Sequence, residues 1–340
     1  MGAYTGGSQS PRRQLIDLYP WLAELLAKVE ADIRQVQEKD SDFLGLAARQ
    51  AVSGRGKRLR PSILLLSAEC AGGATASSIA LAGVVEIVHS ASLVHDDVVD
   101  GASSRRGRRS ANARWGNKVS VLLGDYLIAR AFELVPMTDR EWSVPELAGV
   151  AARMCTGQVT ELRAAGRPLT QAEYLEIAQA KTGALFGFCG YAGARTAGGS
   201  ETLAKALHAF GEKFGVAFQF ADDILDLVGT DGRSGKLEGR DLAEGKFTLP
   251  LILAVEMGGP SLATELTVLL GREEVLTEDV LRVRELVESA GAVEAAWKRV
   301  SEWLASARGE LEALPDGEAK LALIALCGEL FPMPVMAEAG

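Results

Sequence analysis

The chain has 340 residues, of which 48% are hydrophobic and only 6% aromatic. A chain of this length can bury a large core, and a composition rich in Ala, Leu and Val is typical of packed helices. The formal net charge of −9 argues against general binding of nucleic acid. The four cysteines (70, 155, 189 and 327) follow no disulfide or metal-binding spacing, which favours buried thiols in a protein of the reducing cytoplasm.

Residues 1–10 are rich in Gly and Ser, and we expect them to form a flexible N-terminus ahead of one domain that spans residues 11–340. The first residues lack the apolar core of a signal peptide, and no stretch has 18 uninterrupted apolar residues. We therefore expect neither secretion nor a transmembrane segment.

Apolar residues at helical spacing predict helices over residues 21–36 and 42–52. A strongly basic segment follows, Gly54-Arg-Gly-Lys-Arg-Leu-Arg-Pro61, with Pro61 in the first turn of the next apolar helix. Basic runs are often solvated or act as nuclear-targeting signals. The other interpretation is that Lys57 and Arg60 bind a phosphate, since lysine supplies a point charge and arginine a planar fork.

A long, almost wholly apolar helix is predicted from a cap at Ser77 or Ser78 to Asp100. It ends in three carboxylates, Asp96, Asp97 and Asp100, whose spacing of 0, 1 and 4 brings them close together on the helix. Clustered like charges are costly on an apolar helix unless cations neutralise them. The spacing therefore predicts oxygen ligands for a hard divalent cation that also binds phosphate oxygens and water.

Gly101 ends this helix and opens a loop that is rich in arginine. One interpretation is a salt-bridged surface turn, because exposed ion pairs are common and weak. The other is a substrate with several negative charges, such as a diphosphate, held by metal on one side and by arginine forks on the other. The arginines of this loop are Arg105, Arg106, Arg108 and Arg109.

The next helix, over residues 118–135, is expected to stop at Pro136. Capping-box patterns at 143–146 and 170–173 predict two more helix starts. Lys181 then interrupts a stretch of small and apolar residues. A lone lysine is usually exposed to solvent, but these neighbours also permit a buried or ligand-facing side chain.

The helix predicted over residues 201–228 repeats the carboxylate spacing in Asp222, Asp223 and Asp226. We expect the two triads to face each other across one site. A long polar loop over residues 229–248 follows, and polar loops of this length inside a compact domain are usually functional.

The remainder, to about residue 330, reads as short helices, and no segment shows convincing strand alternation. The sequence therefore predicts an all-α, single-domain helical bundle. The expected helix boundaries in this part are Gly259-Pro260, Thr277, Gly291 and Pro315.

The motifs, in this order, resemble those of the trans-type polyprenyl diphosphate synthases, which include farnesyl, geranylgeranyl and longer-chain synthases. The resemblance extends over about residues 40–255. It rests on Gly-Lys-Arg-Leu-Arg-Pro61, Asp-Asp-x-x-Asp100 with Arg-Arg106-Gly, Gln158-x-x-Glu161, Lys181-Thr182, Gln219-x-x-Asp-Asp-x-x-Asp226, Gly-Lys236-x-x-Gly-x-Asp241 and Gly-Lys246-x-Thr-Leu-Pro250.

The resemblance implies an isoprenoid-synthase bundle with a central cavity, and condensation of isopentenyl diphosphate with an allylic diphosphate. It also implies a homodimer and about three Mg²⁺ ions in each site. The metal ligands are then expected from the two triads, Asp96, Asp97, Asp100, Asp222, Asp223 and Asp226.

By the same resemblance, Arg105, Lys181 and Lys246 contact the allylic diphosphate. Thr182 and Gln219 resemble the polar residues of the family beside the carbocation, and the departing diphosphate is the expected base. The residues expected to hold isopentenyl diphosphate are Lys57, Arg60, His89 and Arg106, and Lys236 is a further substrate-binding candidate.

Product length is expected to depend on Ser92 and Ala91, which lie roughly 6 to 8 Å back along the helix from Asp96. In the family, short-chain enzymes often have an aromatic plug at these positions and longer-chain enzymes have small residues. The resemblance therefore implies a product of at least twenty carbons. Candidates for the tunnel floor are Val84, Val88 and Phe132.

Four other functions are compatible with parts of this pattern. A terpene cyclase usually has an Asn/Ser/Glu metal motif in place of the second aspartate triad. A di-iron protein needs two Glu-x-x-His motifs, and His208 has Lys205 where a second glutamate would be needed to match Glu86-x-x-His89. A farnesyl diphosphate synthase, or a non-catalytic subunit of a hetero-oligomeric synthase, would keep the fold and change the activity.

Overall fold

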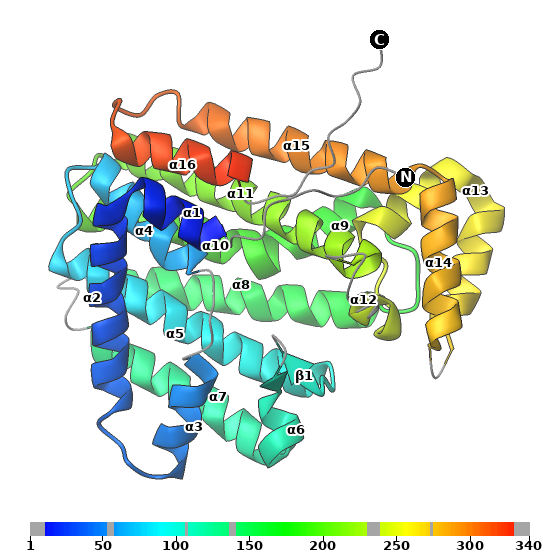
Figure 1. Ribbon diagram of the computed structural model, residues 1–340, viewed down its shortest axis with the longest axis horizontal. Helices are drawn as coiled ribbons and strands as arrows, with labels where there is room; N and C mark the ends of the chain where they lie inside the picture. The colour runs from blue at the N-terminus through cyan, green and yellow to red at the C-terminus, as the bar shows by residue number, and fades with distance from the viewer. Residues whose placement is uncertain are drawn as a thin grey trace.

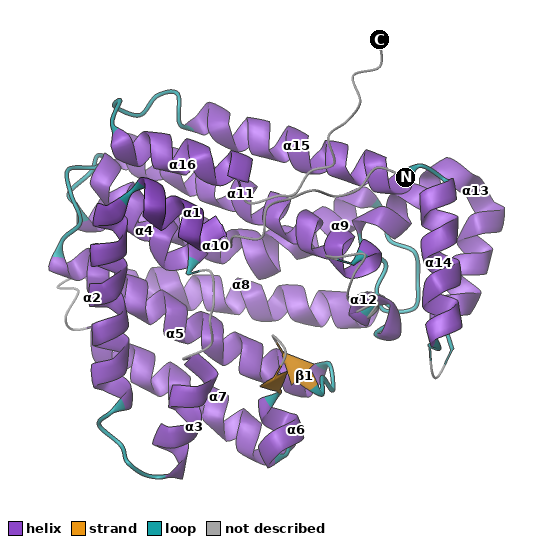
Figure 2. Cartoon of the chain, in the orientation of Figure 1, coloured by secondary structure: helices purple, strands orange, loops and turns teal. Residues whose placement is uncertain are grey.

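The structure is a computed structural model that describes residues 11–52, 58–105, 108–135, 141–229, 239–272 and 275–329. Its described part is helical apart from one small hairpin (Figure 2), which confirms the predicted all-α class. The helices are α1 (Pro11–Leu18), α2 (Pro20–Gln37), α3 (Phe43–Val52), α4 (Leu59–Cys70), α5 (Ala76–Val99), α6 (Ala111–Trp115), α7 (Asn117–Leu134), α8 (Ser143–Ala164), α9 (Gln171–Ala178), α10 (Ala184–Thr196), α11 (Glu201–Val228), α12 (Arg240–Ala243), α13 (Leu249–Leu270), α14 (Thr277–Ser289), α15 (Ala292–Glu310) and α16 (Glu318–Glu329). A π-helical turn, η2 (Gln179–Gly183), joins α9 to α10.

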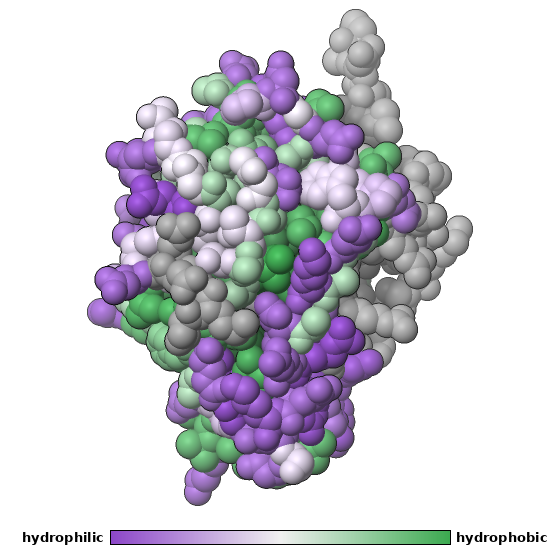
Figure 3. Space-filling model, turned by 90° about the vertical axis from the view of Figure 1, so that its left-hand side faces the viewer, coloured by the Kyte–Doolittle hydropathy of each residue, from purple (hydrophilic) through white to green (hydrophobic). Residues whose placement is uncertain are grey.

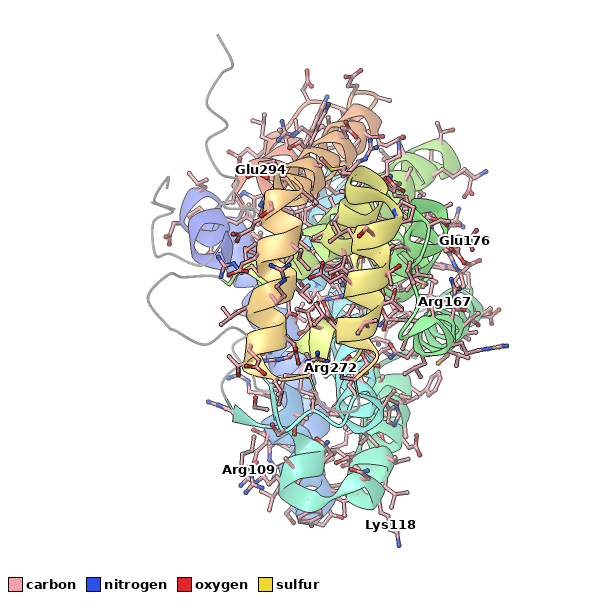
Figure 4. All side chains as sticks on the ribbon, turned by 90° about the vertical axis from the view of Figure 1, so that its right-hand side faces the viewer. Arg109, Lys118, Arg167, Glu176, Arg272 and Glu294 are labelled. Atoms are coloured by element: carbon pink, nitrogen blue, oxygen red, sulfur yellow. The ribbon has the colours of Figure 1, made fainter. Side chains whose placement is uncertain are left out.

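Long helices packed side by side form the body of the molecule (Figure 1). The helix α11 packs between α10 and α15, α10 packs on α4, α4 on α5, and α5 on α7. One core of Leu, Val, Ala and Phe side chains runs through these layers. At one end, α13 and α14 stand beside each other, and Figure 4 shows this end with Arg272 at their link and Arg109 of the hairpin below.

The helices α10 and α11 approach each other closely because glycines lie between them. A Cβ atom at Gly211 would lie 2.2 Å from the carbonyl oxygen of Phe186, and one at Gly190 would lie 2.0 Å from that of Leu207. Only glycine leaves room for the facing backbone at these distances. The close contact also brings η2 beside α11, where Thr182 bonds to Gln219, one turn before Asp223 of the second triad.

The cap predicted at Ser77 or Ser78 lies at Thr75 instead. Thr75 has extended backbone angles, and its side chain accepts a hydrogen bond from the backbone N–H of Ser78. The Ser78 hydroxyl in turn accepts from the Thr75 N–H at 3.2 Å, so Ser78 is the third residue of a capping box. The earlier start lengthens α5 by about half a turn and leaves its aspartate end unchanged.

The two other predicted capping boxes differ in outcome. The box of Thr170 and Glu173 is confirmed at the start of α9. The helix start predicted from Ser143 is confirmed, because α8 begins there, but the preceding residue, Trp142, makes no side-chain cap. Ser143 is instead buried inside the first turn.

The arginine loop contains a hairpin that the sequence did not predict. β1 (Ser104–Arg105) pairs antiparallel with β2 (Arg108–Arg109). Strands of two residues are too short to give an alternating pattern.

The break predicted at Gly259-Pro260 is a kink inside α13, since Gly259 has φ 73° and departs from helical geometry.

Two helices, α5 and α13, are long and apolar enough to cross a membrane by length and composition alone. The apolar window of α5 is 67% buried in this fold and that of α13 is 28% buried. Helices of a protein core pass the same test. On the left-hand face of the molecule, a strip of hydrophobic residues lies between hydrophilic ones (Figure 3).

Candidate active site

A cavity of about 1130 Å³ lies at the aspartate end of α5. Ligand pockets in proteins usually measure on the order of 300–1,000 Å³, so this cavity has room for a substantial ligand. Asp97 of the first triad and Asp222 of the second both line it. Three of the predicted cationic or polar residues, Arg60, His89 and Arg105, line it as well. The two carboxylate helices therefore share one cavity.

In the first triad, Asp97 is held from two sides. Arg105 Nε donates a hydrogen bond to Asp97 Oδ1 at 2.6 Å, and Asn112 Nδ2 donates to its backbone oxygen at 2.9 Å. Burial raises the pKa of Asp97, and Arg105 opposes this shift. Burial also raises the pKa of Asp96, where Lys181 is the main opposing cation. Both carboxylates thus depend on nearby positive charge to remain ionised.

In the second triad, Asp223 is directed into the protein. It is 3% exposed, its Oδ1 accepts a hydrogen bond from Gln219 Nε2 at 2.8 Å, and its Oδ2 accepts one from the Tyr174 hydroxyl. Burial raises the pKa of Asp223 well above its usual range, and the negative charge of Asp241 adds to the shift. Both oxygens are engaged, which argues against the direct metal contact predicted for Asp223.

Lys246 lies between the two triads. Its Nζ is 3.4 Å from Glu161 Oε2 and 3.7 Å from Asp100 Oδ1, and it also pairs with Glu244. Burial disfavours the charge on Lys246, but Glu161 and Glu244 raise its pKa above the ordinary value. Burial likewise disfavours the charge on Glu161, yet Lys181 and Lys246 lower its pKa. Lys246 therefore stays charged, and the ion pairs of the two lysines join elements from distant parts of the chain.

Negative charge remains in excess around this cluster. Burial and the nearby Asp226 raise the pKa of Asp241 to about 7. The described residues contain no closed group of three or more His, Cys, Asp or Glu side chains placed to hold an ion. Mg²⁺ usually binds through one or two carboxylates and completes its shell with water and substrate phosphates. A surplus of carboxylate oxygens beside a large cavity fits a hard cation of this kind.

The π-helical turn η2 carries Lys181 and Thr182. Turns of this type often occur at functional sites, because they change the direction of the side chains within a helix. Thr182 is buried, and its Oγ1 donates a hydrogen bond to Gln219 Oε1 at 2.7 Å. Lys181 Nζ donates to Glu161. The turn thus joins the lysine–carboxylate cluster to the polar pair of Thr182 and Gln219.

Arg60 and His89 lie together in the lining of the cavity. Arg60 Nη1 lies 3.0 Å from His89 Nε2, which must accept because a guanidinium can only donate. The Arg60 guanidinium also lies 4.4 Å from the centre of the Phe186 ring. Arg58, which precedes the first residue of α4, is buried and has φ 51°. It forms an ion pair with Glu86 of α5. Three predicted residues, Lys57, Arg106 and Lys236, lie outside the described residues.

The residues predicted to set product length are not among the described residues that line this cavity. Ala91 is fully buried and Val88 is half-buried. Ser92 is half-buried, and its hydroxyl donates to the backbone oxygen of His89 in its own helix. Phe132 is 51% exposed on α7. Their role therefore stays a prediction.

Sequence reasoning gave no role to several residues of the site. Glu161 and Gln158 stood in a motif of the resemblance, and both side-chain polar atoms of Gln158 are buried without a hydrogen-bond partner within the described residues. Buried polar groups usually have a partner, so this amide is a candidate for contact with substrate or water. Tyr174 carried no sequence signal, because its partner Asp223 lies 49 positions further along the chain.

The chain is similar to known proteins in both sequence and structure. The sequence model of the polyprenyl synthetase family matches residues 41–288. An octaprenyl diphosphate synthase of Haemophilus influenzae is 37% identical over 305 residues, which cover 88% of this chain and 92% of that protein. A nonaprenyl diphosphate synthase of Mycobacterium tuberculosis is 38% identical over 303 residues, which cover 88% of each chain.

Among solved structures, the chain is similar to a polyprenyl synthase of Caulobacter crescentus that is complexed with calcium and isoprenyl diphosphate. The TM-score is 0.87 at 36% identity, and the match covers 95% of this chain and 98% of that one. The family match spans well over half of the chain, and the relatives match it nearly end to end. The chain belongs to the polyprenyl synthetase family of prenyl-transferring enzymes.

Proposed function

We propose that this enzyme condenses isopentenyl diphosphate with a geranyl, farnesyl or geranylgeranyl diphosphate and makes an all-trans polyprenyl diphosphate of twenty or more carbons. The observation that carries the proposal is the shared cavity, in which Asp97 and Asp222 of two helices lie beside arginine side chains. Such a site can bind a diphosphate between cations on both sides.

We assign the metal ligands to the aspartates other than Asp223, whose oxygens already accept two hydrogen bonds. When bound, about three Mg²⁺ ions would neutralise the charge that develops on the departing diphosphate. The ligands in this proposal are Asp96, Asp97, Asp100, Asp222 and Asp226.

The cationic side chains divide between the two substrates. Arg105, Lys181 and Lys246 would hold the allylic diphosphate, and Arg60 and His89 would hold isopentenyl diphosphate together with the residues outside the described part. The allylic C–O bond breaks, and the electrons of the isopentenyl double bond form the new C–C bond. The proton that is then lost passes to the released diphosphate.

The proposal is tested by incubating the purified chain with Mg²⁺, isopentenyl diphosphate and each allylic primer in turn, with sizing of the products by mass spectrometry. A ladder that ends at twenty carbons or more is the expected result. A ladder that ends at fifteen carbons would identify a farnesyl diphosphate synthase. No product from any primer would contradict the catalytic role and favour a non-catalytic subunit.

Product length gives a second test of the same proposal. Replacing Ala91 by phenylalanine is expected to shorten the product, because a ring at this position, about 8 Å from Asp96 along the helix, would block the growing chain. Ala82→Phe is the matched control, since Ala82 is equally buried on α5 but lies farther from the aspartates. An unchanged product distribution in the Ala91 variant would remove Ala91 from the tunnel wall.

We propose that the enzyme is a homodimer in the cytoplasm, where its four cysteines, all free in the structure, would stay reduced. The helix α8 buries only four of its 22 residues and exposes Val159, at 53%, and Leu162, at 44%. The helix α7 exposes Leu122, at 60%, and Phe132. Apolar helix faces of this kind are usually covered in an oligomer.

Replacing Val159 by aspartate is expected to convert the dimer to a monomer, because a charge in an apolar interface loses its hydration without gaining a partner. Light scattering after size-exclusion chromatography measures the mass. Val268→Asp is the control, since Val268 is 61% exposed on α13, away from α7 and α8, and this variant should remain dimeric. A dimeric Val159 variant would contradict the proposed interface.

A further inference from the structure

A chain of three hydrogen bonds links Tyr174, Asp223, Gln219 and Thr182. The Tyr174 hydroxyl donates to Asp223 Oδ2, and Gln219 Nε2 donates to Asp223 Oδ1 at 2.8 Å. At its other end, Gln219 Oε1 accepts from Thr182 Oγ1 at 2.7 Å. The residues come from α9, α11 and η2, so the chain connects three separate elements.

The direction of each bond is set by the groups that make it. An amide nitrogen can only donate and an amide oxygen can only accept, so the bond from Gln219 Nε2 to Asp223 leaves Gln219 Oε1 to face Thr182. Gln219 Oε1 then requires a donor, and the Thr182 hydroxyl supplies its hydrogen. Because its hydrogen is used in this bond, the Thr182 oxygen keeps its lone pairs available to a positively charged group.

We propose that Tyr174 is a positioning residue for prenyl transfer, which acts through Asp223 and Gln219 to orient the hydroxyl group of Thr182. The inference rests on the proposed function, in which the allylic group becomes positively charged as its diphosphate leaves. An oxygen whose lone pairs are already available stabilises such a charge, because it needs no reorientation during the reaction.

Tyr174 is well suited to hold the far end of the chain. It is 4% exposed, and its ring stacks on that of Phe220 with 5.5 Å between the ring centres. It lies in the first turn of α9, where the capping box of Thr170 and Glu173 fixes the helix start. A hydroxyl group on a side chain that is packed in this way loses little further freedom when it binds Asp223.

The test is the variant Tyr174→Phe, which removes the hydroxyl group and keeps the ring and its stacking. We expect the single-turnover rate to fall about tenfold, since one buried hydrogen bond is lost, with the KM for both substrates unchanged. Tyr126→Phe is the matched control, because Tyr126 on α7 also donates to an aspartate, Asp40. This pair lies outside the chain of hydrogen bonds that starts at Tyr174. The control should keep the wild-type rate.

The decisive measurement repeats Tyr174→Phe in a Thr182→Val background. If Tyr174 acts through Thr182, the Thr182→Val substitution removes the hydroxyl group that Tyr174 orients. Tyr174→Phe should then have no further effect on the rate. A purely structural role would lower the rate by the same factor in both backgrounds, and this result would overturn the proposal. A wild-type rate in the single variant would overturn it as well.

A second variant guards against a folding defect. Asp223→Asn keeps the size of the side chain and replaces one acceptor oxygen by a donor, so it should lower the rate and show the same loss of effect in the Thr182→Val background. Additive effects of Asp223→Asn and Thr182→Val on the rate would contradict the proposed chain of hydrogen bonds. A wild-type protein that makes no product from any primer would overturn the proposed function, and the role of Tyr174 with it.

Discussion

Replacing Asp96 by asparagine is expected to lower kcat/KM by at least about a thousandfold. Asparagine has the size of aspartate but carries no charge and offers a weaker oxygen ligand to a hard cation. Burial raises the pKa of Asp96, and Lys181 is the main group that opposes this. A carboxylate that needs cations to remain ionised is a strong site for a divalent metal, and its loss removes that site.

The measurement is the rate of product formation as a function of Mg²⁺ concentration. The Asp96 variant should need more Mg²⁺ and should stay far below the wild-type rate at saturation. The control is Asp17→Asn, the same change at an exposed position on α1, which should leave both quantities unchanged. An Asp96 variant within tenfold of wild type would show that Asp96 is not a metal ligand.

The fold could largely be predicted from the sequence because its signal is local. Helical periodicity and turn residues predicted the carboxylate helices and the end of α5 at Asp100, where the structure has them. Non-local information decided the rest. The cap at Thr75 and Ser78 is also bonded to Thr196 of α10, and the π-helical turn at Lys181 packs on α8 and α11, and no short sequence window contains these contacts.

The site shows the same division. The spacing of 0, 1 and 4 brought three carboxylates together in each triad, but the middle residue of each triad meets a different partner. Asp97 pairs with Arg105 eight residues away, whereas Asp223 is bonded by Tyr174 49 residues away. The first pairing could be anticipated from the neighbouring arginine loop. The second arises only when α9 packs on α11, so the inward direction of Asp223 could not be predicted.

Replacing Lys246 by methionine is expected to lower the rate about a hundredfold and to destabilise the metal-free protein by about 3 kcal/mol. Methionine fills the same space without charge, which leaves Glu161, Glu244 and Asp100 with too few cations. Lys246 is 12% exposed, so solvent screens this loss only weakly. Its folded-state pKa is raised, so its stabilising contribution is complete below its ordinary pKa of 10.5 and is lost only as pH rises through the folded value.

Thermal unfolding at pH 8, with and without Mg²⁺, separates the two roles of Lys246. Mg²⁺ with diphosphate should restore most of the lost stability, because it neutralises the same carboxylates, but it should not restore the rate. Lys213→Met is the control, since Lys213 pairs with Glu310 at a more exposed position, 28% and 32% exposed, outside the site. This variant should unfold within about 1 kcal/mol of wild type and keep its activity. If Lys246→Met were equally stable in the absence of metal, the carboxylates would not depend on Lys246, and the excess of negative charge inferred for the metal site would be wrong.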